Sequence, residues 1–279
     1  MNFKIVVDSS CDLLTLDEVD FTSVPLKIST NEREFVDDDS LDIAEMVDYL
    51  QHYKGRSFTS CPNVAEWEAA FAEGQQIFVF PISSGISGSY QAAVTARENI
   101  LSTHPEKKIH VFNSLTVSCE NILLIERTLE LIRAGEEFDR ICSKVEEYSQ
   151  HTHLIFSLES LHNFAQNGRV SKVTAAAADM LGIRVMGVAS DKGDLEVLAK
   201  LRGQGKAIAG IVAEMKKRGF RGGRVDIGDV FNKEAAALLG EAISDEFGEG
   251  VHLTFHPLRG LCCYYAQSGG LLIGFADSL

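Results

Sequence analysis

The sequence contains no uncharged apolar run of 18 residues, so we expect no segment of it to span a membrane. Its start, residues 1–8, lacks the basic residues, the long apolar stretch and the small-residue cleavage site of a signal peptide. Basic residues are few: 26 Lys and Arg stand against 40 Asp and Glu, and the net charge of −14 repels nucleic-acid phosphates and anionic lipid surfaces. We therefore expect a cytoplasmic protein that neither binds nucleic acid nor inserts into a membrane.

The usual motifs of cofactor, metal and nucleophile sites are also absent. The six cysteines include no C-x-x-C pair and no zinc-finger spacing, which favours reduced, mostly buried thiols. The phosphate loop G-x-x-x-x-G-K-[ST], the nucleophile elbow G-x-S-x-G and the zinc motif H-E-x-x-H do not occur. The acidic run Asp37-Asp38-Asp39 lacks the glycine and distal glutamate of a calcium loop, and we interpret it as a solvated loop at a helix start. No cofactor and no metal are therefore expected.

The first half of the chain does contain a regular alternation of strand-like and helix-like segments. Strands are predicted at residues 3–7, 24–28, 76–82 and 108–112. Helices are predicted at residues 41–53, 63–73, 87–101 and 116–134. This rhythm predicts a parallel sheet with helices on both of its faces.

The second half has a different pattern. Apolar segments at residues 183–189 and 195–201 flank Asp191-Lys192-Gly193-Asp194, which is a signal for a β-hairpin. A hairpin beside further strand and helix segments predicts a mixed sheet. We therefore expect a two-domain α/β protein, with an N-terminal parallel-sheet α/β domain at residues 1–155 and a C-terminal mixed-sheet α/β domain at residues 156–279. Because no Pro-rich or Gly/Ser-rich linker separates them, the two halves should pack closely.

Hydroxyl-bearing residues gather directly after predicted strands or directly before predicted helices. These clusters are Asp8-Ser9-Ser10-Cys11-Asp12, Thr59-Ser60-Cys61-Pro62 and Ser83-Ser84-Gly85-Ile86-Ser87-Gly88-Ser89. The third lies at the edge where an open parallel sheet forms its ligand crevice. Backbone N–H groups at helix starts and neutral hydroxyls attract an anion, although simple N-capping is another use of the same residues. If the second and third clusters converge in space, they can hold one carboxylate or phosphate.

Two small basic islands stand out in this acidic chain. They are Gly168-Arg169-Val170-Ser171-Lys172 and Leu201-Arg202-Gly203-Gln204-Gly205-Lys206. Surface solvation is the ordinary role of such residues. Exposed arginines can also contact a phosphate-bearing ligand or an acidic partner, because the guanidinium matches both in geometry.

Taken together, these residues resemble the DegV family of bacterial fatty-acid-binding proteins. The matching segments are Asp8-Ser9-Ser10-Cys11-Asp12-Leu13, Val24-Pro25-Leu26, Thr59-Ser60-x-Pro62, Ser83-Ser84-Gly85-Ile86-Ser87-Gly88-Ser89-Tyr90-Gln91, Gly168-Arg169-Val170-Ser171-Lys172 and Arg202-Gly203. The family implies a two-domain α/β protein that buries one long-chain fatty acid, palmitate-like or oleate-like, which the second domain helps to cover. It implies that the carboxylate contacts fall on Thr59 and Ser87, with Ser60, Ser84 and Gly88 beside them.

The C-terminus departs from the family pattern. Members with an acyl-transfer role typically place a histidine near the carboxylate, in a Gly/Pro-rich C-terminal segment. Counting back from Gly274-Phe275 puts Tyr265 at that place here. A tyrosine can donate a hydrogen bond but carries no positive charge. His256, on a nearby predicted strand, is the other residue that could take the role.

The resemblance implies a carrier rather than an enzyme. Such a carrier would present its fatty acid to a separate ATP-dependent fatty-acid kinase, which makes an acyl phosphate for phospholipid synthesis. Arg169 and Arg202 are the residues expected to contact that partner. Two alternatives stay open. One is a Ser-dependent hydrolase or phosphoryl-handling enzyme of similar sheet architecture, which needs a base near Ser87. The other is a regulatory subunit whose lipid is a structural filler.

Overall fold

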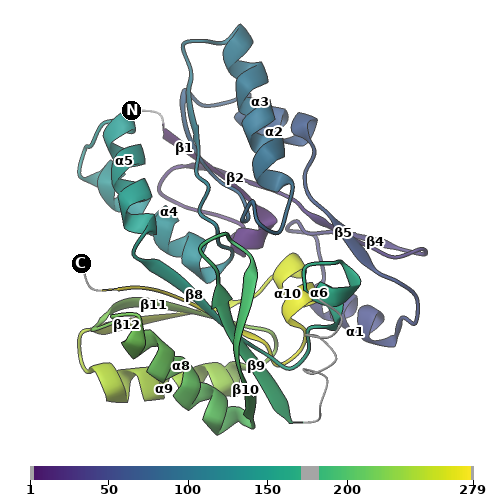
Figure 1. Cartoon of the computed structure of the whole chain (residues 1–279). Coiled ribbons are helices and arrows are strands. Elements are labelled where there is room, and N and C mark those ends of the chain that lie inside the picture. Colours follow the sequence, from purple (N-terminus) through teal and green to yellow (C-terminus); the bar gives the residue numbers. More distant parts are fainter. Residues whose placement is uncertain (1–2, 171–181, 278–279) are drawn as a thin grey trace.

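The computed structural model describes residues 3–170 and 182–277, so Ser171 and Lys172 of the first basic island lie outside the described residues. Four parallel strands form a sheet in the upper half of Figure 1, in the order β2-β1-β6-β7. Their bounds are β1 Phe3–Asp8, β2 Asp20–Val24, β6 Gln76–Phe80 and β7 Lys108–Val111. The parallel sheet predicted for the N-terminal half is confirmed.

Helices cover both faces of this parallel sheet. The helices are α2 Val64–Phe71, α3 Ser89–Thr103, α4 Cys119–Arg133 and α5 Phe138–Ser149. Side chains alternate along β6, so Ile77 and Val79 share a cluster with α2 and α3. Phe78 and Phe80 point the other way, into a cluster with α4 and α5. Burial on both faces explains why residues 77–80 of the strand are all apolar.

The second sheet is mixed, in the order β10-β9-β8-β13-β11-β12, with β11 and β12 parallel and the other pairs antiparallel. Its strands are β8 Thr152–Leu158, β9 Ile183–Ala189, β10 Leu195–Arg202, β11 Gly223–Asp229, β12 Val251–Pro257 and β13 Leu271–Ala276. The helices α8 (Gln204–Lys217) and α9 (Lys233–Phe247) cover one face. The predicted hairpin and mixed sheet are confirmed. None of the helices within residues 3–170 and 182–277 has the length and apolar character needed to cross a membrane.

The strand predicted at residues 24–28 is wrong. Pro25 has no N–H to donate, and β2 ends just before it. The chain then enters a separate antiparallel sheet of order β4-β3-β5. The elements of this region are β3 Lys27–Ser29, β4 Glu34–Val36, the helix α1 Ile43–His52 and β5 Phe58–Ser60.

Two short helical elements were not predicted: the 3-10 turn η1 Ser9–Cys11 and α10 Gly260–Ala266. Of these, α10 lies between β12 and β13, where the sequence indicated only strands. Both are too short to show a helical repeat of apolar residues, so sequence periodicity could not reveal them. By contrast, α6 His162–Gln166 is the short helix that the sequence predicts after the strand at residues 153–157.

The division of the chain into domains at residues 1–155 and 156–279 stays a proposal. β8 runs through residue 155, and its pairing belongs to the second sheet. The turn at residues 150–151, between α5 and β8, is therefore a better place for the division. The small sheet and α1 fit neither half cleanly, because Ile28 and Met46 share a hydrophobic cluster with Phe156 of β8.

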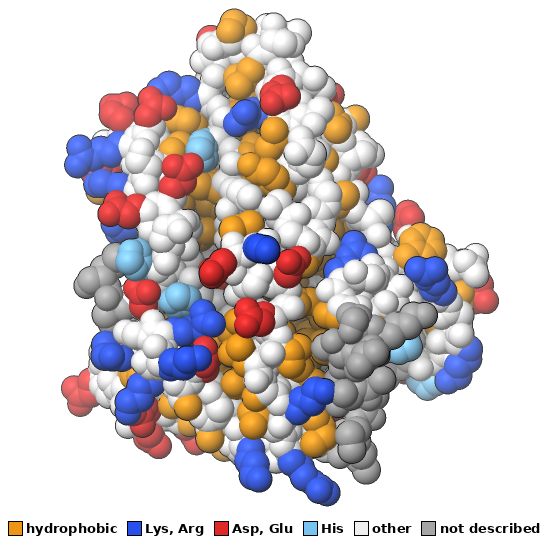
Figure 2. Space-filling view, in the orientation of Figure 1, with side chains coloured by type: hydrophobic (Ala, Val, Ile, Leu, Met, Phe, Trp, Pro, Cys, Tyr) orange, Lys and Arg blue, Asp and Glu red, His pale blue; other side chains and the backbone are white. Residues whose placement is uncertain are grey.

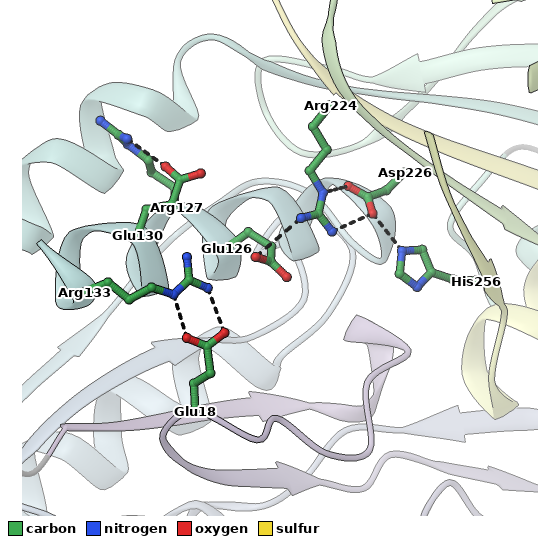
Figure 3. A network of polar contacts seen from close by, with 8 residues as sticks. All are labelled: Glu18, Glu126, Arg127, Glu130, Arg133, Arg224, Asp226 and His256. Atoms are coloured by element: carbon green, nitrogen blue, oxygen red, sulfur yellow. Dashed lines mark hydrogen bonds and ion pairs between the residues drawn. The ribbon is translucent and has the colours of Figure 1, made fainter. Parts of the chain in front are cut away.

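The helix α4 joins the two large sheets. Leu124 and Leu129 lie in the cluster beneath the parallel sheet, whereas Cys119, at its start, packs in the cluster over the second sheet. Figure 3 shows a polar link across the same junction, in which Arg224 of β11 lies 3.4 Å from Glu126 of α4. The close packing expected of the two halves is confirmed.

A buried carboxylate reinforces this junction. Glu120, in the first turn of α4, accepts hydrogen bonds from the hydroxyls of Thr116 at 2.5 Å and of Thr152 in β8 at 2.7 Å. Burial raises the pKa of Glu120 to about 7, although both hydrogen bonds act to lower it. The folded protein therefore holds a proton on Glu120 that the unfolded chain releases at a lower pH.

Replacing Glu120 with glutamine should change how stability depends on pH. Because its pKa is raised on folding, Glu120 favours the folded state most below its ordinary pKa of 4.5, and this contribution is lost as the pH rises toward about 7. Glutamine does not titrate, so Glu120→Gln should gain roughly 1–3 kcal/mol relative to wild type between pH 4.5 and 7.5. Urea unfolding across this range measures the difference. The exposed Glu241→Gln is the control, and parallel curves for wild type and Glu120→Gln would contradict the prediction.

Candidate functional site: an apolar cavity between the sheets

An apolar cavity lies where the second sheet, α10 and the loop after β6 meet. Its volume is about 160 Å³. The second sheet contributes Leu154, Phe156, Leu158, Leu195 and Leu272 to its wall. Loops and helices contribute further apolar side chains, among them Leu26, Ile82, Ile86, Val117 and Phe164. The polar side chains in the wall are Thr59, Ser87, Arg169 and Tyr265.

Hydroxyl groups from three parts of the chain converge on this cavity. Thr59 Oγ1 of β5 and the Tyr265 hydroxyl of α10 lie 2.8 Å apart and share a hydrogen bond. Ser87 precedes α3, and its Oγ accepts a hydrogen bond from the backbone N–H of Ser89 at 3.2 Å, which leaves its own hydrogen for a ligand. Gly88 also lines the cavity. The structure thus brings together four of the predicted site residues: Thr59, Ser87, Gly88 and Tyr265.

Aromatic contacts and burial hold Tyr265 in place. Its ring centroid lies 4.6 Å from that of Phe164 and 4.9 Å from that of Tyr264. Burial raises the pKa of Tyr265 above its usual value, against the opposing effects of the Thr59 hydrogen bond and the Arg169 charge. The phenol therefore stays neutral near pH 7, where it can donate a hydrogen bond.

Two buried carboxylates hold the first turn of α10 and so orient Tyr265. Asp37 accepts hydrogen bonds from the backbone N–H groups of Gly260 at 2.9 Å and of Leu261 at 2.8 Å. Asp12 accepts a hydrogen bond from the backbone N–H of Arg259, the residue before Gly260, at 2.6 Å. Negative charge is favourable at a helix N-terminus, where N–H groups lack partners within the helix. The interpretation of the acidic run as a solvated loop is wrong for Asp37, which is only 1% exposed.

The loop that carries Ser87 is fixed from two sides. Asp8, at the end of β1, accepts a hydrogen bond from the Ser89 hydroxyl at 2.6 Å. The Ser83 hydroxyl donates to the Gly193 carbonyl, in the tip of the β9–β10 hairpin, at 2.8 Å. Figure 1 shows this hairpin reaching out of the second sheet toward the first. The loop position therefore depends on both large sheets.

Arg169, which we expected to contact a partner, lines the cavity. Its Nε donates to the Ile86 carbonyl, next to Ser87, at 3.2 Å, and its Nη1 donates to the Asn167 carbonyl at 2.7 Å. Asn167 Nδ2 in turn donates to the Tyr264 hydroxyl at 2.9 Å. The guanidinium thus lies among the hydroxyls at the polar end of the cavity. No local pattern in the sequence indicated this, because the contacts of Arg169 with Ile86 and of Asn167 with Tyr264 join residues more than 80 positions apart.

The other predicted residues lie away from the cavity. Ser60 and Ser84 are exposed, and neither lines it. Arg202 is exposed at the end of β10. His256 of β12 is bound to Asp226, with Nε2 2.7 Å from Oδ1, as Figure 3 shows. We therefore assign none of these to the polar end of the cavity.

The described residues show no grouping suited to a metal ion. Within residues 3–170 and 182–277, no three His, Cys, Asp or Glu side chains come together as metal ligands. The six cysteines are all free thiols, and those at positions 61 and 262 lie in the cavity wall. The site therefore consists of an apolar chamber, three hydroxyls and one guanidinium.

A mixed sheet, the helix α10 and the loop that follows β6 line an apolar cavity with one polar end, which defines an α/β protein with a candidate binding site between its two large sheets. The chain belongs to the DegV family, described as uncharacterised proteins, whose family model matches residues 2–274. A DegV domain-containing protein of Streptococcus pneumoniae is 36% identical over 279 residues, which cover 99% of both chains.

Solved structures are similar over the whole chain. A DegV family protein from Eubacterium eligens loaded with heptadecanoic acid is 39% identical with a TM-score of 0.96, covering 99% of this chain and 100% of that one. The Fatty Acid Kinase (Fak) B3 protein of Streptococcus pneumoniae loaded with linoleic acid is 35% identical with a TM-score of 0.97, covering 100% of both chains.

Proposed function

We propose that the protein binds one long-chain fatty acid in this cavity, with the tail against the second sheet and the carboxylate near Thr59, Ser87 and Tyr265. The cavity itself carries the proposal, because apolar walls with hydroxyls and a guanidinium at one end match an amphipathic anion. The similar proteins from Eubacterium eligens and Streptococcus pneumoniae, which hold heptadecanoic and linoleic acid, support it.

The polar end has hydrogen-bond donors to offer a carboxylate. Thr59 and Tyr265 have two hydroxyl hydrogens between them, and their mutual hydrogen bond uses one. The other, together with the Ser87 hydrogen, is available to the ligand. A 16-carbon tail removes about 14 methylenes from water, worth roughly 11 kcal/mol before association and ordering costs. Tail burial therefore sets most of the affinity, and the head group sets orientation.

Organic extraction of the purified protein, followed by mass spectrometry, tests the function. We expect about one long-chain acyl group per protein, and saturable binding of added palmitate or oleate after the lipid is removed. If neither is found, the cavity serves another ligand and the proposal is wrong.

Substitutions at the polar end should weaken binding more than folding. Thr59→Ala and Ser87→Ala should each lower fatty-acid affinity by about 0.5–3 kcal/mol, a range that spans ordinary hydrogen bonds and those to a charged group. Ser60→Ala and Ser84→Ala are matched controls, because each removes a neighbouring exposed hydroxyl outside the cavity. Titration calorimetry measures the affinities. Equal affinities for all four variants and wild type would place the carboxylate elsewhere.

The role we propose is that of a carrier without chemistry of its own. A Ser-dependent hydrolase needs a base within reach of Ser87, and no histidine is among the cavity-lining residues of the described chain. We infer that a separate fatty-acid kinase activates the bound acid, as the name of the similar Streptococcus pneumoniae protein suggests. The free thiols fit a cytoplasmic site of action, where thiols stay reduced.

Arg202 is our remaining candidate for the contact with that kinase. It is exposed beside the start of α8, where Figure 2 shows further Lys and Arg side chains toward the lower rim of the face.

Incubation of the loaded protein with the host's kinase and ATP should form acyl phosphate. Arg202→Glu should slow this reaction at low salt while fatty-acid binding is unchanged. If wild type forms no acyl phosphate, the protein binds lipid for another purpose. Arg169 is not suited to this test, because it lines the cavity.

A further inference from the structure

The floor of the cavity is a row of side chains on β8. Leu154, Phe156 and Leu158 line the cavity, whereas Ile155 points to the opposite face, among the side chains under α8 and α9. Phe156 is the middle residue of this row. Its ring is therefore flanked along β8 on both sides by side chains that also line the cavity.

A glycine lies directly beside Phe156 on the same face. Gly187 of β9 is paired with Phe156 in the antiparallel register. A Cβ atom at Gly187 would lie 2.2 Å from Phe156 Cζ and 2.7 Å from Cε2. Carbon atoms in contact are normally about 3.5–4.0 Å apart, so the ring lies over β9 in the space that a side chain at 187 would occupy.

We propose that Gly187 sets the orientation of the Phe156 ring, and that this pair determines which acyl-chain lengths the cavity accepts. The inference rests on the proposed function and deepens it by assigning the residues that select the ligand. Gly187 acts through Phe156 as a positioning residue, and Phe156 is the residue that contacts the tail.

The surroundings decide where the ring moves if it is displaced. The opposite face of β8 and β9 is packed, because Ile155, Met186 and Val188 belong to the cluster with Ile211 of α8. On its own face, Phe156 has Gly187 on one side and Leu272 of β13, its partner in register, on the other. The open direction is the cavity. A side chain at 187 would therefore push the ring into the cavity and narrow it at the middle.

A constriction in the middle penalises long tails more than short ones. Carbons of the tail that cannot pass the ring lose their burial, whereas a short tail that ends before it loses little. Two methylenes left unburied correspond to about tenfold in affinity. A smaller side chain at position 156 widens the cavity beside it and should therefore favour long tails.

The test compares affinities of wild type and variants for saturated acids of 12 to 18 carbons. Gly187→Ala should lower affinity for the 18-carbon acid about tenfold more than affinity for the 14-carbon acid. Phe156→Leu should shift the preference the other way, toward longer chains. Gly210→Ala is the matched control, because its Cβ would meet Leu201 and Met186 on the packed face, at 2.7 and 3.2 Å, and not the cavity.

Gly187→Ala and Phe156→Leu both perturb packing, so a loss of affinity alone would not separate this role from a merely structural one. Shifts of the chain-length preference in opposite directions do separate the two. A Cβ at Gly187 would lie 2.3 Å from the Glu196 carbonyl oxygen as well, so Gly187→Ala must displace β10 and is at risk of misfolding. Phe156→Trp then narrows the cavity by enlarging the ring itself, without a change at Gly187, and should also favour short chains. If the variants keep the wild-type preference for chain length, the inference is overturned. If wild type binds no fatty acid of any length, the proposed function itself has failed.

Discussion

Gly274→Ala is expected to lower the free energy of unfolding by about 3 kcal/mol, at the upper end of the usual cost of overpacking a core. Gly274 lies in β13 between Leu154 of β8 and Asp226 of β11. A Cβ there would lie 2.5 Å from both the carbonyl carbon and the oxygen of Cys119, and 2.7 Å from the Glu120 nitrogen. These are backbone atoms at the start of α4, which cannot turn aside as a flexible side chain does.

Urea unfolding of Gly274→Ala measures this loss. Gly250→Ala is the control, because a Cβ at Gly250 would meet no atom within 4 Å. Since α4 packs against both sheets, we also expect Gly274→Ala to weaken fatty-acid binding at the junction. Equal stability of the two variants would mean that α4 does not rest on β13 as closely as the structure indicates.

Asp37→Ala is the second substitution with a large expected effect, a loss of about 2–4 kcal/mol in the free energy of unfolding. It removes a charged acceptor from the N–H groups of Gly260 and Leu261 and leaves both buried without that partner. Burial raises the pKa of Asp37 while these hydrogen bonds act to lower it. Because α10 carries Tyr265, fatty-acid affinity should fall as well.

Two further variants sharpen the Asp37 experiment. Asp39→Ala removes a carboxyl group from an exposed position two residues away and should be close to neutral. Asp37→Asn keeps one acceptor oxygen and should lie between wild type and Asp37→Ala in both stability and affinity. If Asp37→Ala unfolds like Asp39→Ala, α10 does not depend on this cap.

The elements that sequence predicted well carry their own signals. After Gln76, β6 is an apolar run buried on both faces, and α3 follows it after a Ser/Gly loop, so both could be placed within two residues. The β9–β10 hairpin was recognised from Gly193 in its tip, which has a φ of +75°. Such a φ favours glycine, so the glycine at this position predicts the turn from the sequence.

The elements that were missed depend on distant residues. α10 has seven residues, and its first turn is held by Asp12 and Asp37, more than 220 positions away. The wrong prediction of a strand at residues 24–28 is different, because its cause is local: Pro25 interrupts strand pairing. The 27–60 region then packs partly on the second sheet, which no periodicity could show.

The sequence by itself determined the alternating α/β architecture, the turn chemistry and the hydroxyl-rich loops, because periodicity, glycine and capping residues act over a few positions. Its family motifs also pointed to Thr59, Ser87 and Tyr265. Only the tertiary structure decided that these three share one cavity with Arg169, that His256 is held by Asp226, and that Ser60 and Ser84 face solvent. Those outcomes depend on how two sheets and α4 pack together, and packing joins residues whose separation along the chain carries no local signal.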